Sequence, residues 1–182
     1  MPVYIALLRG INIGPHKRMK MEKLRASCEG LKLERVKTYV QSGNVVFRAA
    51  KQSPARLAKN LEAMIVHEFG FTSTVVIRTD DEIGAVIRNN PFRGETGIDE
   101  SRFCVAFLSA EPAAGALKRL SALPQMPEQS HPRGDNVYLY YPNGFAKTKL
   151  TTNFLEKVLD VDATIRNWRT VNSLHAMAQE CQ

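Results

Sequence analysis

The chain has 182 residues, of which 44% are hydrophobic and 24% are charged. This composition suffices for one sizeable core or for two small cores that share an interface, and it argues against gross disorder. The formal net charge of +7 favours encounters with anions such as nucleic acids, nucleotides, phosphorylated metabolites or membrane surfaces. A basic surface that binds nothing is an equal alternative.

Cysteine usage and the first residues bear on the cellular compartment. Cys28, Cys104 and Cys181 are far apart and lack C-x-x-C spacing, which argues against a disulfide framework and against a thiolate metal site. Cys28 and Cys104 lie inside apolar patterns, so we expect buried fillers rather than nucleophiles. The apolar run at 3–8 is too short for a signal peptide or a membrane span. We therefore expect a cytoplasmic protein with no membrane partner.

Apolar periodicity and turn residues predict the elements of the first half. Strands are expected at about 3–8, 36–40, 45–47 and 74–78, and helices at about 20–29 and 54–69. Ser53-Pro54 is a typical helix start and Gly70 a typical stop. Ser42-Gly43-Asn44 indicates a hairpin. The order β-α-β-β-α-β is that of a ferredoxin-like unit.

The same order returns after a short helix, which Asp80 is expected to cap and Asn89-Asn90-Pro91 to stop. The polar segment 94–100 is interpreted as the joint between halves. Beyond it, strands are expected at 102–108, 126–131, 136–141 and 163–165, and helices from Pro112, from Thr151 or Thr152, and from Asn167. We therefore predict an α+β fold of two tandem ferredoxin-like (βαββαβ) halves, 1–93 and 94–182, the second with a C-terminal helix.

Four segments resemble a known bacterial family. They are 4–14 (YIALLRGINIG), 38–47 (TYVQSGNVVF), 141–145 (YPNGF) with Lys147 and Lys149, and 164–171 (TIRNWRTV). Together they are similar to the family catalogued as domain of unknown function 1697, over essentially the whole chain. The resemblance implies a two-part α+β fold of ferredoxin-like character. It implies no established activity, substrate or catalytic residue.

The loop after the first strand and the hairpin form the candidate site. In a ferredoxin-like sheet the first and third strands are antiparallel neighbours, so this loop lies beside the turn that precedes the third strand. Glycines allow close approach, amides and hydroxyls donate hydrogen bonds, and a guanidinium contacts phosphate in a bidentate manner. The basic run 16–20 precedes a helix N-terminus, which also favours anions. The predicted anion-binding residues are Arg9, Gly10, Asn12, Lys17, Arg18, Gln41, Ser42 and Asn44.

The competing interpretation is that these residues only shape turns and a solvated surface. The second half offers further candidates with the same ambiguity. Lys147 and Lys149 precede a helix start, and Arg166 and Arg169 flank the start of the last helix. Here Asn167 is most simply a helix cap and Trp168 a packing residue.

Several chemistries are disfavoured by missing motifs. The chain lacks G-x-G-x-x-G after its first strand, Gly-Lys-Ser/Thr, H-E-x-x-H and G-x-S-x-G. Stacking of RNA on the first sheet is disfavoured because the segment 42–47 lacks the required aromatic pair. His16 is a weak candidate for a general acid or base, and no cofactor or metal is predicted.

Three roles stay open: a binding protein for a phosphate-bearing molecule or nucleic acid backbone, an enzyme acting on an anionic substrate, and a structural or assembly protein whose oligomeric state the sequence does not give.

Overall fold

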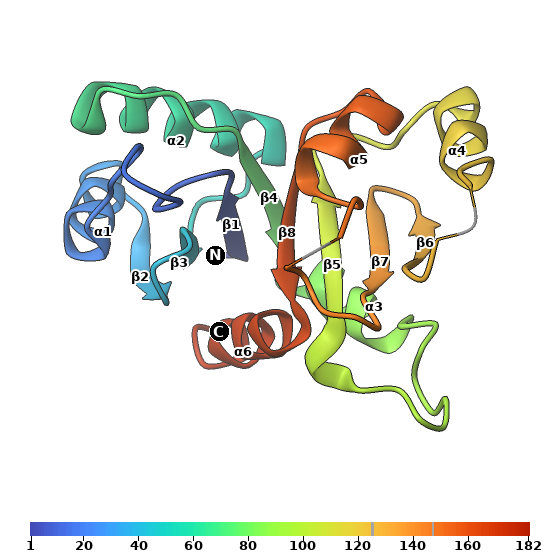
Figure 1. Cartoon of the computed structure of the whole chain (residues 1–182). Coiled ribbons are helices and arrows are strands. Elements are labelled where there is room, and N and C mark those ends of the chain that lie inside the picture. The colour runs from blue at the N-terminus through green and yellow to red at the C-terminus, as the bar shows by residue number, and fades with distance from the viewer. Residues whose placement is uncertain (125, 147) are drawn as a thin grey trace. The chain divides into compact units, whose positions relative to one another are not determined.

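The computed structural model describes residues 1–124, 126–146 and 148–182, and its fold is α+β (Figure 1). The chain divides into two compact units. The first comprises Met1–Ala85 together with Ser173–Gln182, and the second comprises Val86–Asn172. The C-terminal ten residues are thus grouped with the first sheet, whereas the sequence-based division assigned them to 94–182. Independently folding halves with a boundary at 93/94 stay a prediction.

The first unit contains a four-stranded antiparallel sheet with the strand order β2-β3-β1-β4. Its elements are β1 (Val3–Leu8), α1 (Met21–Gly30), β2 (Glu34–Tyr39), β3 (Asn44–Arg48), α2 (Pro54–Phe69) and β4 (Val75–Thr79). Both helices cover one face of the sheet (Figure 1), where alternate β1 residues such as Tyr4, Ala6 and Leu8 join Leu57 and Leu61 of α2 in one core. The two-residue period of a strand explains why only one residue in two enters this core.

Helix α2 shows how local sequence sets an element's limits. The hydroxyl of Ser53 accepts a hydrogen bond from the backbone N–H of Arg56 at 3.3 Å, and Pro54 opens the first turn. At the other end Gly70 takes φ +75°, a left-handed conformation that glycine adopts without steric cost. The predicted start and stop of this helix are confirmed.

Helix α3 (Asp80–Arg88) begins with a different cap from the one predicted. The Thr79 hydroxyl accepts from the N–H of Glu82 at 3.2 Å, and the Glu82 carboxylate accepts from the N–H of Thr79 at 2.7 Å. This is a reciprocal capping box. Asp80 therefore does not cap the helix, and its carboxylate instead contacts side chains of the C-terminal segment. The prediction was wrong because the local pattern Thr79-x-x-Glu82 forms the cap one residue earlier.

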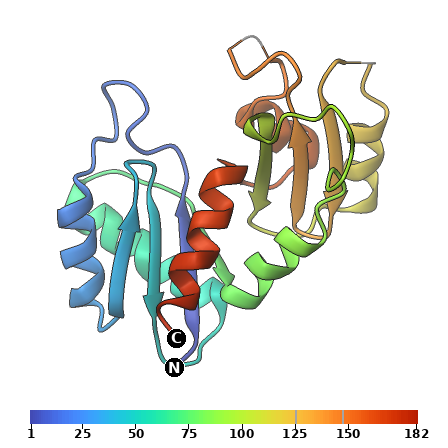
Figure 2. The ribbon, with the colours of Figure 1, turned by 90° about the horizontal axis from the view of Figure 1, so that it is seen from below.

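The C-terminal segment Ser173–Gln182 packs on the first unit through polar contacts at both its ends. Asp80 is bonded to His175 Nδ1 at 2.8 Å and to the side-chain amides of Gln179 and Gln182 at 2.5 and 3.0 Å. On strand β2, Lys37 pairs with Glu180 at 3.0 Å. Figure 2 shows the end of α6 (Trp168–Gln179) beside the strands of this sheet.

The second unit repeats this arrangement with the strand order β6-β7-β5-β8, again antiparallel throughout. Its elements are a single 3₁₀ turn at Glu100–Arg102, β5 (Phe103–Leu108), α4 (Ala114–Ser121), β6 (Gln129–Arg133), β7 (Asn136–Tyr140), α5 (Thr152–Leu159) and β8 (Ala163–Asn167). The predicted cap Thr151 accepts from the N–H of Phe154 at 3.3 Å, and Asn167 accepts from the N–H of Thr170 at 2.8 Å. The predicted starts of these two helices are confirmed.

Two predicted boundaries in this unit were wrong. Helix α4 begins at Ala114, because Ala113 and not Pro112 is the residue with an extended backbone at the cap. Strand β6 lies at 129–133 rather than 126–131, since its position is set by pairing with β7, where Gln129 faces Tyr140 and Arg133 faces Asn136. Register of this kind depends on the partner strand and not on local propensity.

The two units have equivalent hydrogen bonds at the ends of equivalent strands, which shows that their backbone arrangement is repeated. At the end of each central strand an N–H donates at 2.9 Å to the following hairpin, and a glutamate on the second helix accepts at 2.9 Å from the start of the last strand. The donor–acceptor pairs are Leu8 with Gly43 and Leu108 with Asp135, and then Val75 with Glu62 and Ala163 with Glu156. The two halves therefore share backbone geometry despite different side chains.

All three cysteines are buried, which allows a simple chemical test. Burial raises the pKa of the Cys28 and Cys104 thiols to about 12, so that at pH 8 less than about one thiol in a thousand is a reactive thiolate. We expect a disulfide reagent at pH 8 to label these two only in denaturant, measured by mass spectrometry against time. Labelling of the native protein at the denatured rate would contradict the packing described.

Among the described residues, no helix combines the length and hydrophobicity that crossing a membrane requires.

Candidate functional site

The end of β1 meets the starts of both neighbouring strands at one corner of the first sheet. Leu7 of β1 faces Asn44 of β3, and the N–H of Leu8 donates to the Gly43 carbonyl at 2.9 Å. The next N–H, that of Arg9, donates to the carbonyl of Thr74 at 2.9 Å. The predicted adjacency of the loop after β1 and the β2–β3 hairpin is confirmed. The start of β4 lies there too, which sequence reasoning missed.

Asn12 connects the two loops at this corner. Its side-chain amide donates to the carbonyls of Met19 at 2.9 Å and Gln41 at 2.8 Å, while its oxygen accepts from the N–H of Met19 at 2.8 Å. Its φ of +54° lies in the left-handed region, which asparagine tolerates better than most residues. The polar groups of Asn12 thus hold the backbone that carries the cationic run.

Other polar groups of the corner have similar structural contacts. Asn44 is fully buried, and its amide donates to the carbonyl of Tyr39 at 3.0 Å and to the Ser42 hydroxyl at 2.9 Å. The Ser73 hydroxyl donates to the carbonyl of Arg9 at 2.8 Å. The Lys17 ammonium donates to the carbonyl of Thr72 at 2.7 Å. These contacts set the shape of the loops, and a ligand role for the same groups stays a prediction.

A hollow of about 840 Å³ opens at the corner, in front of helix α1. It is lined by Asn12, Arg18, Met19, Lys20, Met21, Glu22 and Gln41. Lys20 is the N-cap residue of α1, and its side chain makes no capping hydrogen bond. The first N–H groups of a helix have no partner within it, and the first residues of α1, Met21 and Glu22, line this hollow. Three of the predicted site residues, Asn12, Arg18 and Gln41, therefore share one hollow with an uncapped helix start.

The backbone at the corner is unusual in a second respect. Val40 has φ +49° and is about half exposed, although a β-branched side chain is an outlier in the left-handed region. Gly43 has φ +71°, and a Cβ atom there would lie 2.7 Å from Cβ of Leu8 and from Cδ1 of Ile11. Sequence reasoning indicated the glycine as a turn residue but gave no sign of its close packing or of the strained valine.

The remaining predicted residues lie elsewhere. His16 is exposed in the loop before α1, and Lys149 and Arg169 are exposed near helix starts in the second unit. Arg166 is 7% exposed and donates to the Thr164 hydroxyl at 2.6 Å and to the Ile165 carbonyl at 3.0 Å; burial lowers its pKa to about 10. Lys147 lies outside the described residues. Of the described residues in this group, His16, Lys149, Arg166 and Arg169, none lines the hollow that Arg18 lines.

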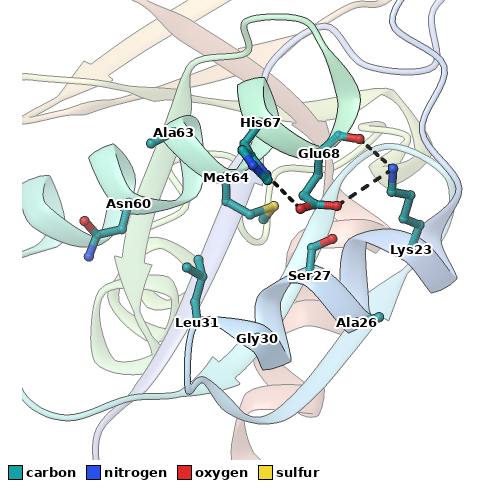
Figure 3. Close-up of a pocket in the computed structure, with 10 residues that line it drawn as sticks. All are labelled: Lys23, Ala26, Ser27, Gly30, Leu31, Asn60, Ala63, Met64, His67 and Glu68. Atoms are coloured by element: carbon teal, nitrogen blue, oxygen red, sulfur yellow. Dashed lines mark hydrogen bonds and ion pairs between the residues drawn. The ribbon is translucent and has the colours of Figure 1, made fainter.

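A second hollow, of about 760 Å³, lies between α1 and α2 (Figure 3). Its polar side chains mainly contact each other: Lys23 donates to the carbonyl of Glu68 at 2.5 Å, His67 Nδ1 lies 2.9 Å from the Glu68 carboxylate, and the Lys23 ammonium lies 4.8 Å from the Phe69 ring centre. We assign it no ligand. Within the described residues, no group of three or more metal-binding side chains is gathered.

Comparison with known proteins agrees with this geometry at the level of fold. Residues 1–138 match the model of a family described as a protein of unknown function (DUF1697). The chain belongs to the DUF1697 family. The family resemblance inferred from the sequence motifs is therefore confirmed. The match includes the whole corner built by Arg9–Lys20 and Gln41–Asn44.

A solved structure extends the comparison beyond the family match. The conserved bacterial protein SP0830 from Streptococcus pneumoniae is similar with a TM-score of 0.74 and 22% sequence identity, covering 97% of this chain and 98% of that one. Identity this low supports a shared fold only. No curated protein matches the sequence significantly. Neither comparison assigns a ligand to the corner hollow.

Proposed function

We propose that this DUF1697 protein binds a phosphate-bearing anion, either a nucleotide-like molecule or a nucleic acid backbone, in the corner hollow of the first unit. The observation that carries the proposal is the start of α1, which lacks a side-chain cap, at a hollow lined by two cations, Arg18 and Lys20, and one carboxylate, Glu22. Helix N–H groups and a guanidinium are complementary to phosphate oxygens. Gln41 also lines the hollow, and its side-chain amide offers a neutral donor and acceptor.

The second unit has a hollow at the joint that corresponds to Arg9 and Thr74. There the N–H of Ser109 donates to the Asp162 carbonyl, as that of Arg9 does to Thr74. The local hollow, of about 390 Å³, is lined by Ser109, Glu156, Asp160, Val161 and Asp162. Glu156 corresponds to Glu62 of the first unit, since each accepts from the first N–H of the last strand, so this joint carries a carboxylate in both halves. The cations Arg18 and Lys20 lie in a different hollow, at the start of α1.

We also infer that each half is a ferredoxin-like unit, because both strand orders and both βαββαβ element orders agree with that topology. A cytoplasmic location belongs to the same proposal. It is supported by Cys28, Cys104 and Cys181, which form no disulfide.

Removing the two cations should abolish most of the anion affinity. We expect the double change Arg18→Gln with Lys20→Gln to weaken binding of adenosine 5′-monophosphate or a single-stranded oligonucleotide by at least about 100-fold, because two charge-assisted hydrogen bonds of about 1.5–3 kcal/mol each are lost. Isothermal titration calorimetry measures the change. Lys59→Gln, an exposed lysine of α2, is the control. Equal losses in the control and the double variant would reject the corner as the site.

Salt dependence separates the two ligand classes. For a nucleic acid backbone, affinity should fall steeply as sodium chloride rises from 50 to 200 mM, because neutralised phosphates release counterions. For a mononucleotide the slope should be shallow. A shallow slope with an oligonucleotide would reject the backbone version and leave the nucleotide version standing.

A further inference from the structure

Five aromatic rings from separate segments gather in the second unit. They belong to Phe92, Phe103 of β5, His131 of β6, Tyr140 of β7 and Trp168 at the start of α6. Phe92 stacks on Phe103 with centroids 4.8 Å apart and an interplanar angle of 20°. Phe103 meets Tyr140 at 5.4 Å and Trp168 at 6.4 Å edge to face, and His131 meets Phe92 at 5.1 Å. We call these five rings the aromatic cluster.

The rings differ in their exposure. Phe92 and Phe103 are each 3% exposed, whereas Tyr140 and Trp168 are half-buried and His131 is exposed. Tyrosine and tryptophan rings bury a large apolar face while keeping a polar edge near water. The two phenylalanines therefore fix the orientation of three rings that solvent reaches.

The cluster lies on the sheet face that α4 and α5 leave uncovered. Phe103 and Tyr140 are direct partners in the central strand pair, and their neighbours Cys104 and Leu139 point into the core on the helix side. In the first sheet the pair equivalent to Phe103–Tyr140 is Val3–Arg48. The second sheet thus has an aromatic pair at the position where the first sheet has a valine and an arginine.

Arginines accompany the rings along the chain. Arg93 follows Phe92, Arg102 precedes Phe103, Arg133 is two residues from His131, and Arg169 follows Trp168. Arg93, Arg133 and Arg169 are exposed, while Arg102 pairs with Asp99 at 3.2 Å. Because residues two apart in a strand share a face, Arg133 lies on the same face of β6 as His131. Partly exposed aromatic rings with flanking guanidiniums are the combination that binds bases and their phosphates.

We propose that the aromatic cluster is a stacking platform for nucleobases that carry a phosphate, with Tyr140, His131 and Trp168 as the contact rings. The ligand is a free nucleotide or a single strand of nucleic acid, which share this chemistry. Arg133 and Arg169 contact the phosphate. This site is independent of the corner hollow, because its residues belong to the second unit.

The lone tryptophan of the chain gives a direct readout. A base that stacks at the cluster should quench Trp168 fluorescence, whereas ribose 5-phosphate, which has no base, should not. A single-stranded adenylate decamer and adenosine 5′-monophosphate are the two probes. Quenching by both identifies a nucleotide site, and quenching by the decamer alone identifies a single-strand site. Quenching by neither, or equally by ribose 5-phosphate, overturns the proposal.

Variants locate the contact. Tyr140→Leu should weaken decamer binding about 5- to 150-fold, the range observed when one stacking ring is lost, and Arg133→Gln should weaken it and reduce its salt dependence. The matched controls are Phe145→Leu, another exposed ring of the same unit, and Lys118→Gln, an exposed cation of α4. Circular dichroism verifies that each variant is folded. Equal affinities for Tyr140→Leu and Phe145→Leu would overturn the platform, whatever the Arg18 and Lys20 variants do at the corner.

Discussion

Replacing Gly43 with alanine is expected to destabilise the protein by about 3 kcal/mol, because a left-handed non-glycine residue and an overpacked contact each cost about 1–3 kcal/mol. The new Cβ atom would lie 2.7 Å from Cβ of Leu8 and 2.7 Å from Cδ1 of Ile11, both fully or nearly fully buried. The backbone at position 43 has φ +71°. Relief of the clash requires moving Leu8, whose N–H donates to the Gly43 carbonyl. The free energy of unfolding in guanidinium chloride measures the effect.

Gly14 provides the matched control for this change. It has φ +65°, and a Cβ atom there would meet nothing within 4 Å. Gly14→Ala should therefore cost only the conformational term, about 1 kcal/mol. The difference between the two variants isolates the packing contribution at the corner. Equal destabilisation of both would show that close packing of Gly43 against β1 is unimportant.

Replacing Asn12 with alanine is expected to cost about 2–4 kcal/mol, since about 1 kcal/mol is lost per hydrogen bond and the left-handed backbone loses a residue that tolerates it. The change removes the three hydrogen bonds to Met19 and Gln41. It also removes the hydrogen bond that connects the hairpin to the loop with Arg18 and Lys20. We therefore expect anion affinity at the corner to fall along with stability, measured by calorimetry and by guanidinium denaturation.

Gln41→Ala tests the same connection from the other side. Asn12 donates to the backbone carbonyl of Gln41 and not to its side chain, so this variant keeps the bond. An exposed substitution of this kind should change stability by no more than about 0.5 kcal/mol. Asn12→Asp should resemble Asn12→Ala, because a carboxylate would face the carbonyls of Met19 and Gln41. A stable Asn12→Asp protein would contradict the connecting role of this side chain.

The adjacency of the two loops was predictable, whereas the use of their side chains was not. Once the order β-α-β-β-α-β was read from the sequence, strand pairing required that the loop after β1 lie beside the hairpin, and Leu7 does face Asn44. Nothing in the pattern indicated that Asn12 and Asn44 would bond to backbone carbonyls. Such contacts depend on distances of a few tenths of an ångström, which residue types do not encode.

The aromatic cluster was likewise predictable only in part from the sequence. The strand containing Tyr138 and Tyr140 was predicted, and Trp168 was expected to pack. That Phe92 and Phe103 would stack 4.8 Å apart next to them required the register of β5 on β7 and the path of the segment after α3. Rings from five separate segments meet only in the folded unit.

The amino-acid sequence alone determined the class of fold, the limits of helices such as α2, and the family, because caps, turn glycines and hydrophobic period are local properties that act over a few residues. The tertiary structure alone decided that Ser173–Gln182 completes the first unit, that Asp80 binds that segment, and that Arg18 and Lys20 share one hollow with Asn12 and Gln41. Those outcomes bring together residues as far apart in sequence as Lys37 and Glu180, which are separated by 143 positions. They are set by the burial of whole faces and by strand register, and no local pattern reports either.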